Sequence, residues 1–265
     1  MVVPREHGAW GMMLVPLATG AVVAARTAVN SAALITLLIA TISLFWLRTP
    51  LESWLGTSPI KAQTDYERGL LTKAIVAIGA VAAGNVIALF WNGHNRGLLI
   101  IGAIAALAFA TQAGVRRLGR KGRMPAQIIG AIGLTSTAAG AYYVATGQLD
   151  RTGFALWLAN WLFAADQIHF VQVRIHTSQA ETFNEKLQPG LGFLMGLIGL
   201  IGVIFAACRL GFFPAAIAIA FLPILLRGTI WFARGRQPLD VHKLGYSELA
   251  QALVFGALLC AAFLL

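Results

Sequence analysis

The residues best suited to chemistry gather in one stretch, 165–190, which follows an apolar run. Asp166, His169 and Gln172 recur at three-residue steps, and Arg174 lies about one helical turn beyond His169, so a helix would bring them to roughly one face. A histidine near an acid can serve as a general acid or base, and an arginine can hold an anionic group. The alternative is that His169 is a buried packing residue.

A second charged group follows an earlier apolar run. Arg48 and Glu52 lie four residues apart, so a helix that continues through a kink at Pro50 would place them one turn apart on the same face. Lys61 and Arg68 follow in a polar segment. An ion pair at the edge of a membrane is a candidate functional feature, because an unpaired charge in hydrocarbon is costly. The alternative is a structural pair that fixes the end of the helix.

The composition indicates a membrane protein. The chain has 265 residues, of which 58% are hydrophobic and only 11% charged, and its mean hydropathy is +0.76. A soluble domain could not cover its surface with so few polar groups. We expect a single integral membrane domain over residues 1–265, whose basic excess of 20 Lys and Arg over 10 Asp and Glu meets lipid headgroups and not nucleic acid. Cys208 and Cys260 have no metal-binding spacing.

The apolar runs predict an all-α protein with about nine transmembrane helices. Each run is close to the 17–25 residues that cross a hydrocarbon core of about 30 Å. The eighth is the least regular, because Pro223 and Arg227 interrupt it. The predicted spans are 9–25, 31–47, 70–91, 97–115, 124–146, 154–173, 191–208, 211–233 and 246–265.

The charges predict an orientation for these spans. If the chain crosses the membrane nine times, all but four of the 20 basic residues fall on one side, the exceptions being Arg26, Arg96, Arg151 and Arg209. Every acid except Asp150 falls on the same basic side. Because cytoplasmic loops are enriched in Lys and Arg, we predict a cytoplasmic-membrane protein with its N-terminus inside and its C-terminus outside. The polar side then suits a cytoplasmic activity, although longer internal loops alone would also concentrate polar residues there.

Two further residues enter the predicted polar side. His7 stands beside Arg5 and Glu6 just before the first apolar run, where it can be a ligand, a charge partner or a helix cap. Lys186 follows the sixth span and, with Lys61, adds to the cations that can bind an anionic group.

Three stretches resemble a known family. They are PREHGAW at 4–10, RTPLESWL at 48–55 and RQPLDVHKLGYSELAQALVFGALL at 236–259. Together they resemble the YwiC-like membrane proteins along essentially the whole chain. That family is more distantly similar to the UbiA superfamily of intramembrane prenyltransferases. The resemblance implies nine helices, an internal N-terminus, and polar loops after the second and sixth spans that close over a lipid-filled cavity.

The UbiA likeness also implies a site. Enzymes of that superfamily bind two Mg²⁺ ions, and through them an isoprenyl diphosphate, with acids about four residues apart in the two loops. Carried onto this chain, the motifs fall on 48–52 and 166–174, and each keeps one acid, Glu52 and Asp166. Because the paired carboxylates are missing, a two-metal cluster is not expected, and Arg48 and Arg174 are the candidates to hold the phosphate directly.

Three functions follow as hypotheses. The first is a UbiA-like enzyme of the prenyl transfer class that acts on an isoprenoid, a quinone precursor or another lipid. The second is a lipid-, quinone- or haem-binding subunit or carrier without enzymatic activity, and the third is an assembly protein without a small-molecule site. The enzyme hypothesis assigns catalysis to Glu52, Asp166 and His169. It assigns substrate binding to His7, Arg48, Lys61, Arg68, Gln172, Arg174 and Lys186. It requires the two charged helix ends to meet over one pocket.

Overall fold

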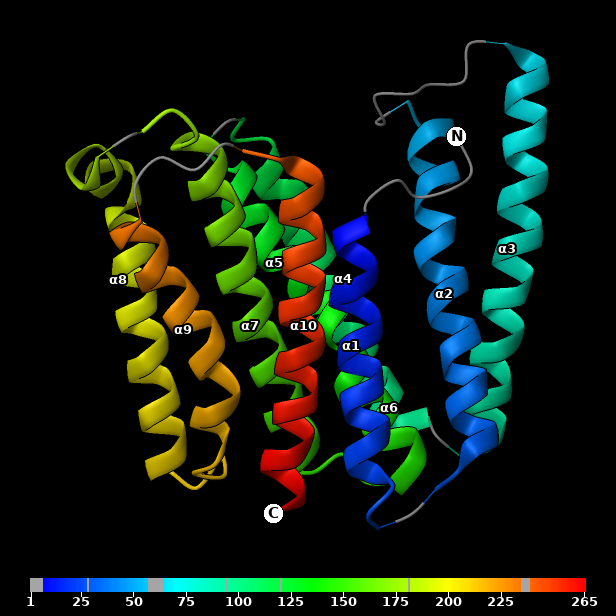
Figure 1. Ribbon diagram of the computed structural model, residues 1–265. Helices are drawn as coiled ribbons and strands as arrows, with labels where there is room; N and C mark the ends of the chain where they lie inside the picture. Colours follow the sequence, from blue (N-terminus) through cyan, green and yellow to red (C-terminus); the bar gives the residue numbers. More distant parts are fainter. Residues whose placement is uncertain are drawn as a thin grey trace.

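The chain folds into a bundle of long helices (Figure 1). The computed structural model describes residues 7–27, 29–56, 64–93, 95–119, 121–180, 182–234 and 239–265, and these contain helices and no strand. Six of the helical segments are long and apolar enough to cross a membrane, and two shorter ones are also apolar. The prediction of an all-α polytopic membrane protein is confirmed.

The helices correspond to the nine predicted spans. Helices α5 and α6 are separated only by Ser136 and together form the fifth span. The sixth span, α7, is not among these eight apolar segments, and it carries the polar residues Asn160, Asp166 and Gln167. The helices are α1 (His7–Ala24), α2 (Ser31–Trp54), α3 (Asp65–Trp91), α4 (Asn95–Arg116), α5 (Arg123–Thr135), α6 (Thr137–Thr146), α7 (Arg151–His176), α8 (Phe183–Arg209), α9 (Ile217–Ala233) and α10 (Val241–Leu264).

Three helices begin earlier than their apolar runs because polar residues cap them. Thr64 accepts a hydrogen bond from the backbone N–H of Glu67 at 3.2 Å, and the Glu67 carboxylate accepts one from the N–H of Thr64, which completes a capping box at the start of α3. Thr182 caps α8 and Asp240 caps α10 through their own side chains. These polar first turns extend beyond the apolar runs from which the spans were predicted.

Two helices have other boundaries than predicted: α2 is longer and α9 is shorter. Helix α2 continues through Pro50 to Trp54, well past the predicted end at Leu47, as the pairing of Arg48 with Glu52 required. Helix α9 begins at Ile217 and not at Gly211, because the residues after α8 form a tight turn in which the N–H of Phe212 donates to the carbonyl of Ala207 at 2.8 Å.

Helices α1, α6 and α7 lie at the centre of the bundle. Helix α1 packs on α6 and α10, and α7 packs on α5, α6 and α8. The approach of α1 to α6 is close, since a Cβ atom on Gly20 would lie 2.1 Å from the backbone oxygen of Ala138. On either side lie two outer groups, α8 with α9 and α2 with α3 (Figure 1).

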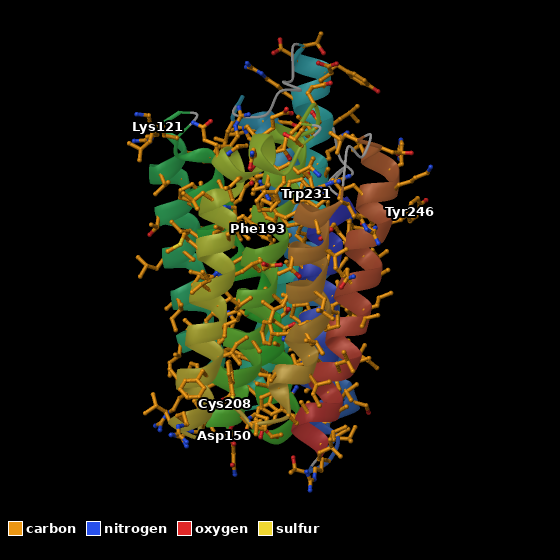
Figure 2. All side chains as sticks on the ribbon, turned by 60° about the vertical axis from the view of Figure 1, so that its left-hand side comes forward. Lys121, Asp150, Phe193, Cys208, Trp231 and Tyr246 are labelled. Carbon is orange, nitrogen blue, oxygen red and sulfur yellow. The ribbon has the colours of Figure 1, made fainter. Side chains whose placement is uncertain are left out.

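The two ends of the bundle differ in charge. The end where α2, α4, α7 and α9 finish carries most of the basic residues, and we call it the basic face. Figure 2 shows Lys121 and Trp231 toward this end and Asp150 and Cys208 at the opposite end. This arrangement agrees with the alternation assumed for the charge count, and the cytoplasmic location of the basic face stays a prediction.

Candidate functional site

Three charged side chains from three helices meet inside the bundle. Arg227 of α9 donates from Nη1 to both carboxylate oxygens of Glu248 on α10, at 2.6 and 2.5 Å, and from Nη2 to Asp166 on α7, at 3.1 Å. Their side chains are 13%, 13% and 5% exposed, respectively. We call this cluster the charged triad. Because two carboxylates share one guanidinium, the triad carries a net charge of −1 when all three groups are ionised.

Neighbouring side chains fix the triad in place. The Arg227 guanidinium carbon lies 4.0 Å from the ring centroid of Phe170, one helical turn beyond Asp166 on α7. The amide of Gln167 donates to the backbone carbonyl of Glu248 at 2.8 Å. Helix α7 therefore holds both the guanidinium and the backbone of α10.

A pocket of about 470 Å³ opens beside the triad at the basic face. Four cations and one acid line it, together with two aromatic, two aliphatic and two uncharged polar side chains. This combination suits a ligand with an anionic head and an apolar body. The lining residues come from α7, α9, α10 and the segment between the last two: Phe170, Arg174, Arg227, Ile230, Trp231, Arg234, Asp240, Lys243, Leu244, Ser247 and Gln251.

The one acid of this lining, Asp240, lies before the membrane-spanning part of α10 and caps that helix. The carboxylate of Asp240 accepts a hydrogen bond from the backbone N–H of Lys243 at 3.1 Å. This bond, assisted by the nearby Lys243 ammonium, holds the pKa of Asp240 below its ordinary value. Asp240 is therefore ionised at neutral pH and partly offsets the cations around it.

Lys186 of α8 is buried behind the pocket wall. Its ammonium donates to the backbone carbonyls of Trp231 and Arg234 at the end of α9, and it lies 5.0 Å from the centroid of the Trp231 ring. The guanidinium carbon of Arg174 approaches the same ring at 5.9 Å. A cation at the C-terminal carbonyls of a helix is stabilising. Lys186 thus secures the helix that carries Arg227 and Trp231.

Replacing Lys186 with methionine is expected to lower the free energy of unfolding by about 1–3 kcal/mol, because buried carbonyls at the end of α9 lose a charged donor. Thermal unfolding in detergent micelles would measure the change. Lys73→Met, at an exposed position of α3, is the matched control and is expected to have little effect. Equal stability of the two variants would show that Lys186 does not secure α9.

The charged pair of α2 lies apart from the pocket. Arg48 Nε donates to Glu52 Oε1 at 2.9 Å, which confirms the predicted pairing. Neither residue lines the pocket, and α2 packs mainly on α3 and α6. Arg68 is exposed on α3. Lys61 and the side chain of His7 lie outside the described part of the chain. Within the described residues, the pocket beside the triad therefore includes Arg174 but neither residue of the α2 pair, so the two charged helix ends do not meet over this pocket as expected.

The predicted shared face of α7 also needs correction. His169 lies against α8, with its ring 5.3 Å from that of Phe193, and Gln172 donates to Gln127 on α5 at 3.3 Å. Asp166 instead faces α9 and α10. Each step of three residues turns a helix by about 300°, so Asp166 and Gln172 are about 120° apart. Phe170 and Arg174, which do line the pocket, follow Asp166 at steps of four residues.

Comparison with known proteins assigns the chain to a family. The model of the YwiC-like protein family matches residues 3–144, which is just over half of the 265 residues. The chain belongs to the YwiC-like family. No curated protein and no solved structure gives a match.

The family match and the pocket occupy different parts of this YwiC-like chain. The matched residues include the Arg48–Glu52 pair, whereas the charged triad and the pocket lie beyond residue 144. The family match therefore does not extend to the pocket, and only the geometry of the pocket bears on its role.

The residues of this YwiC-like protein do not fit the two-metal cluster of UbiA-type enzymes. Within the described residues, no group of three His, Cys, Asp or Glu side chains is arranged to hold a metal ion. The two carboxylates that do approach each other, Asp166 and Glu248, have the guanidinium of Arg227 between them. Mg²⁺ requires oxygen ligands, and here both acids already bind a cation.

Arg227 and Glu248 belong to the site, but this was not predicted from the sequence. Arg227 was treated as an interruption of the eighth span, and Glu248 only as an acid of the basic side. The signal was nevertheless present, because a charged residue inside an apolar run requires a buried partner of opposite charge. Pairing Arg227 with the acids of α7 and α10 would have predicted the triad.

Proposed function

We propose that this YwiC-like membrane protein binds an anionic isoprenoid lipid, an isoprenyl phosphate or diphosphate, in the pocket formed by α7, α9 and α10. The observation that supports the proposal is the lining of the pocket, where Arg174, Arg234 and Lys243 are gathered beside Phe170 and Trp231. Arginine binds phosphate bidentately, and the aromatic and aliphatic side chains suit an isoprenoid chain.

Prenyl transfer is the reaction class that we propose for the bound lipid, by analogy with the UbiA superfamily. In this reaction the bond between the isoprenoid carbon and the diphosphate oxygen breaks, and the acceptor bonds to that carbon. Arginines at the pocket would stabilise the charge that develops on the departing diphosphate. The residues Glu52, Asp166 and His169 lie outside the lining, so a catalytic role for them is not part of this proposal.

A second function is favoured by one observation. Both acids of the triad bind Arg227. A buried ion cluster of this kind can serve a purely structural role. The pocket would then hold a lipid or quinone in a subunit or carrier that catalyses no transfer. A transfer assay with labelled isoprenyl diphosphate and a panel of acceptors separates the two functions, because only the enzyme yields a prenylated product.

Direct binding tests the shared part of the proposal. Protein in lipid nanodiscs is titrated with labelled farnesyl diphosphate. Arg174→Ala and Arg234→Ala are each expected to weaken binding by about tenfold or more, because each removes a charge-assisted contact. Arg68→Ala, on exposed α3, controls for the general loss of a cation. If the wild type does not bind farnesyl diphosphate, or if Arg174→Ala and Arg234→Ala bind it as well as Arg68→Ala does, the pocket is not the lipid site.

A further inference from the structure

We infer that Arg227 takes the place of a metal ion in this pocket: Asp166 and Glu248 hold the guanidinium as a permanent cation for an anionic lipid head, so that binding requires no divalent metal. This inference rests on the proposed function and specifies how the head is recognised.

The geometry of the guanidinium supports the inference. Its Nη1 is bound by both oxygens of Glu248, its Nη2 by Asp166, and its face lies on the ring of Phe170. A group held on two edges and one face has little freedom to move. The two acids therefore act as positioning residues for a cation, in the way that carboxylates elsewhere position a bound metal.

One edge of the guanidinium has no acceptor. The Nε of Arg227 is buried and has no hydrogen-bond partner among the described residues, and the same is true of the amide oxygen of Gln251. Both residues line the pocket. A buried donor without an acceptor is costly, and a phosphate oxygen would satisfy it. Rotation of the Gln251 amide by half a turn would replace its unpaired acceptor with a donor.

The charges around the pocket allow an anion to bind beside the triad. With all groups ionised, the triad alone carries −1, but Arg174, Arg234 and Lys243 add three positive charges, and Asp240 subtracts one. The sum over these seven groups is +1. A metal ion is therefore not needed to make the site attractive to a phosphate.

The test compares the affinity for labelled farnesyl diphosphate with Mg²⁺ present and with EDTA, in nanodiscs. The wild type is expected to bind equally well under both conditions. Arg227→Lys keeps the charge and loses the planar fork, so it is expected to bind about tenfold more weakly under both conditions. Arg116→Lys, at the end of α4 on the same face, is the matched control and is expected to bind as the wild type does. Circular dichroism and size exclusion show that each variant is folded.

The outcomes separate the inference from the proposed function. Wild-type binding that disappears in EDTA overturns the metal-independent role of Arg227 and leaves the lipid site in place. Wild-type binding that Arg227→Lys does not weaken also overturns it. If farnesyl diphosphate does not bind the wild type under either condition, the proposed function and this inference are both wrong.

Discussion

Arg227→Met is expected to lower the free energy of unfolding by about 3–5 kcal/mol, because it leaves two buried carboxylates without a counter-ion. The substitution preserves most of the side-chain volume, so the loss is electrostatic and not a packing defect. It also removes the ionic contacts of α9 with Asp166 of α7 and with Glu248 of α10. Denaturation by sodium dodecyl sulfate in mixed micelles would measure the change.

Two comparisons make the result specific. Arg48→Met breaks a pair whose side chains are 28% and 37% exposed, and it is expected to cost at most about 1 kcal/mol. Neutralising the acids in the same chain, as in the triple variant with Asp166→Asn and Glu248→Gln, is expected to restore most of the stability lost in Arg227→Met. Equal losses for Arg227→Met and Arg48→Met would show that the buried triad does not stabilise the bundle.

Gly20→Ala is expected to destabilise the protein by about 3 kcal/mol, at the upper end of the usual cost of overpacking. The new Cβ atom would lie 2.1 Å from the carbonyl oxygen of Ala138 and 2.9 Å from its carbonyl carbon. These are backbone atoms in the middle of the bundle, so α1 and α6 must move apart. At Gly97, by contrast, the nearest atoms belong to the side chain of Tyr143 and not to the backbone.

Gly79→Ala is the matched control for the effect of a methyl group on a helix. No atom lies within 4 Å of the position that its Cβ would take. Since alanine has a higher helix propensity than glycine, this variant is expected to be neutral or stabilised by up to about 1 kcal/mol. Denaturation curves of the two variants in the same detergent give the comparison. A Gly20→Ala protein as stable as Gly79→Ala would show that α1 and α6 pack less tightly than described.

The spans could be predicted because the membrane imposes their length. In the described part of the chain, the nine apolar runs of crossing length correspond to nine helical segments, since an unpaired backbone in hydrocarbon is too costly to leave any other fold. The helix starts could not be predicted from hydropathy. Thr64, Thr182 and Asp240 begin their helices in polar sequence, where side-chain caps and not apolar burial decide the boundary.

The candidate site was only partly predictable, because its partners are distant in the chain. Asp166 was identified, and so was Arg174 eight residues on, but Arg227 lies 61 residues beyond Asp166. No local spacing connects them, and only the packing of α7, α9 and α10 brings them together. The placement of His169 failed for a local reason, since steps of three residues rotate a side chain away from the starting face.

The outer helix α3 is longer than the hydrocarbon core of a membrane is thick. With 27 residues it is about 40 Å long, whereas the hydrocarbon core is about 30 Å thick. It packs mainly on α2, and exposed Val76, Val81 and Ile87 lie along its length. A helix longer than the core can tilt to fit it, and because α3 packs mainly on α2, any tilt of α3 involves α2. The wall of α7, α9 and α10 has its own ionic and aromatic contacts, so we expect its geometry to depend less on the length of the surrounding lipids.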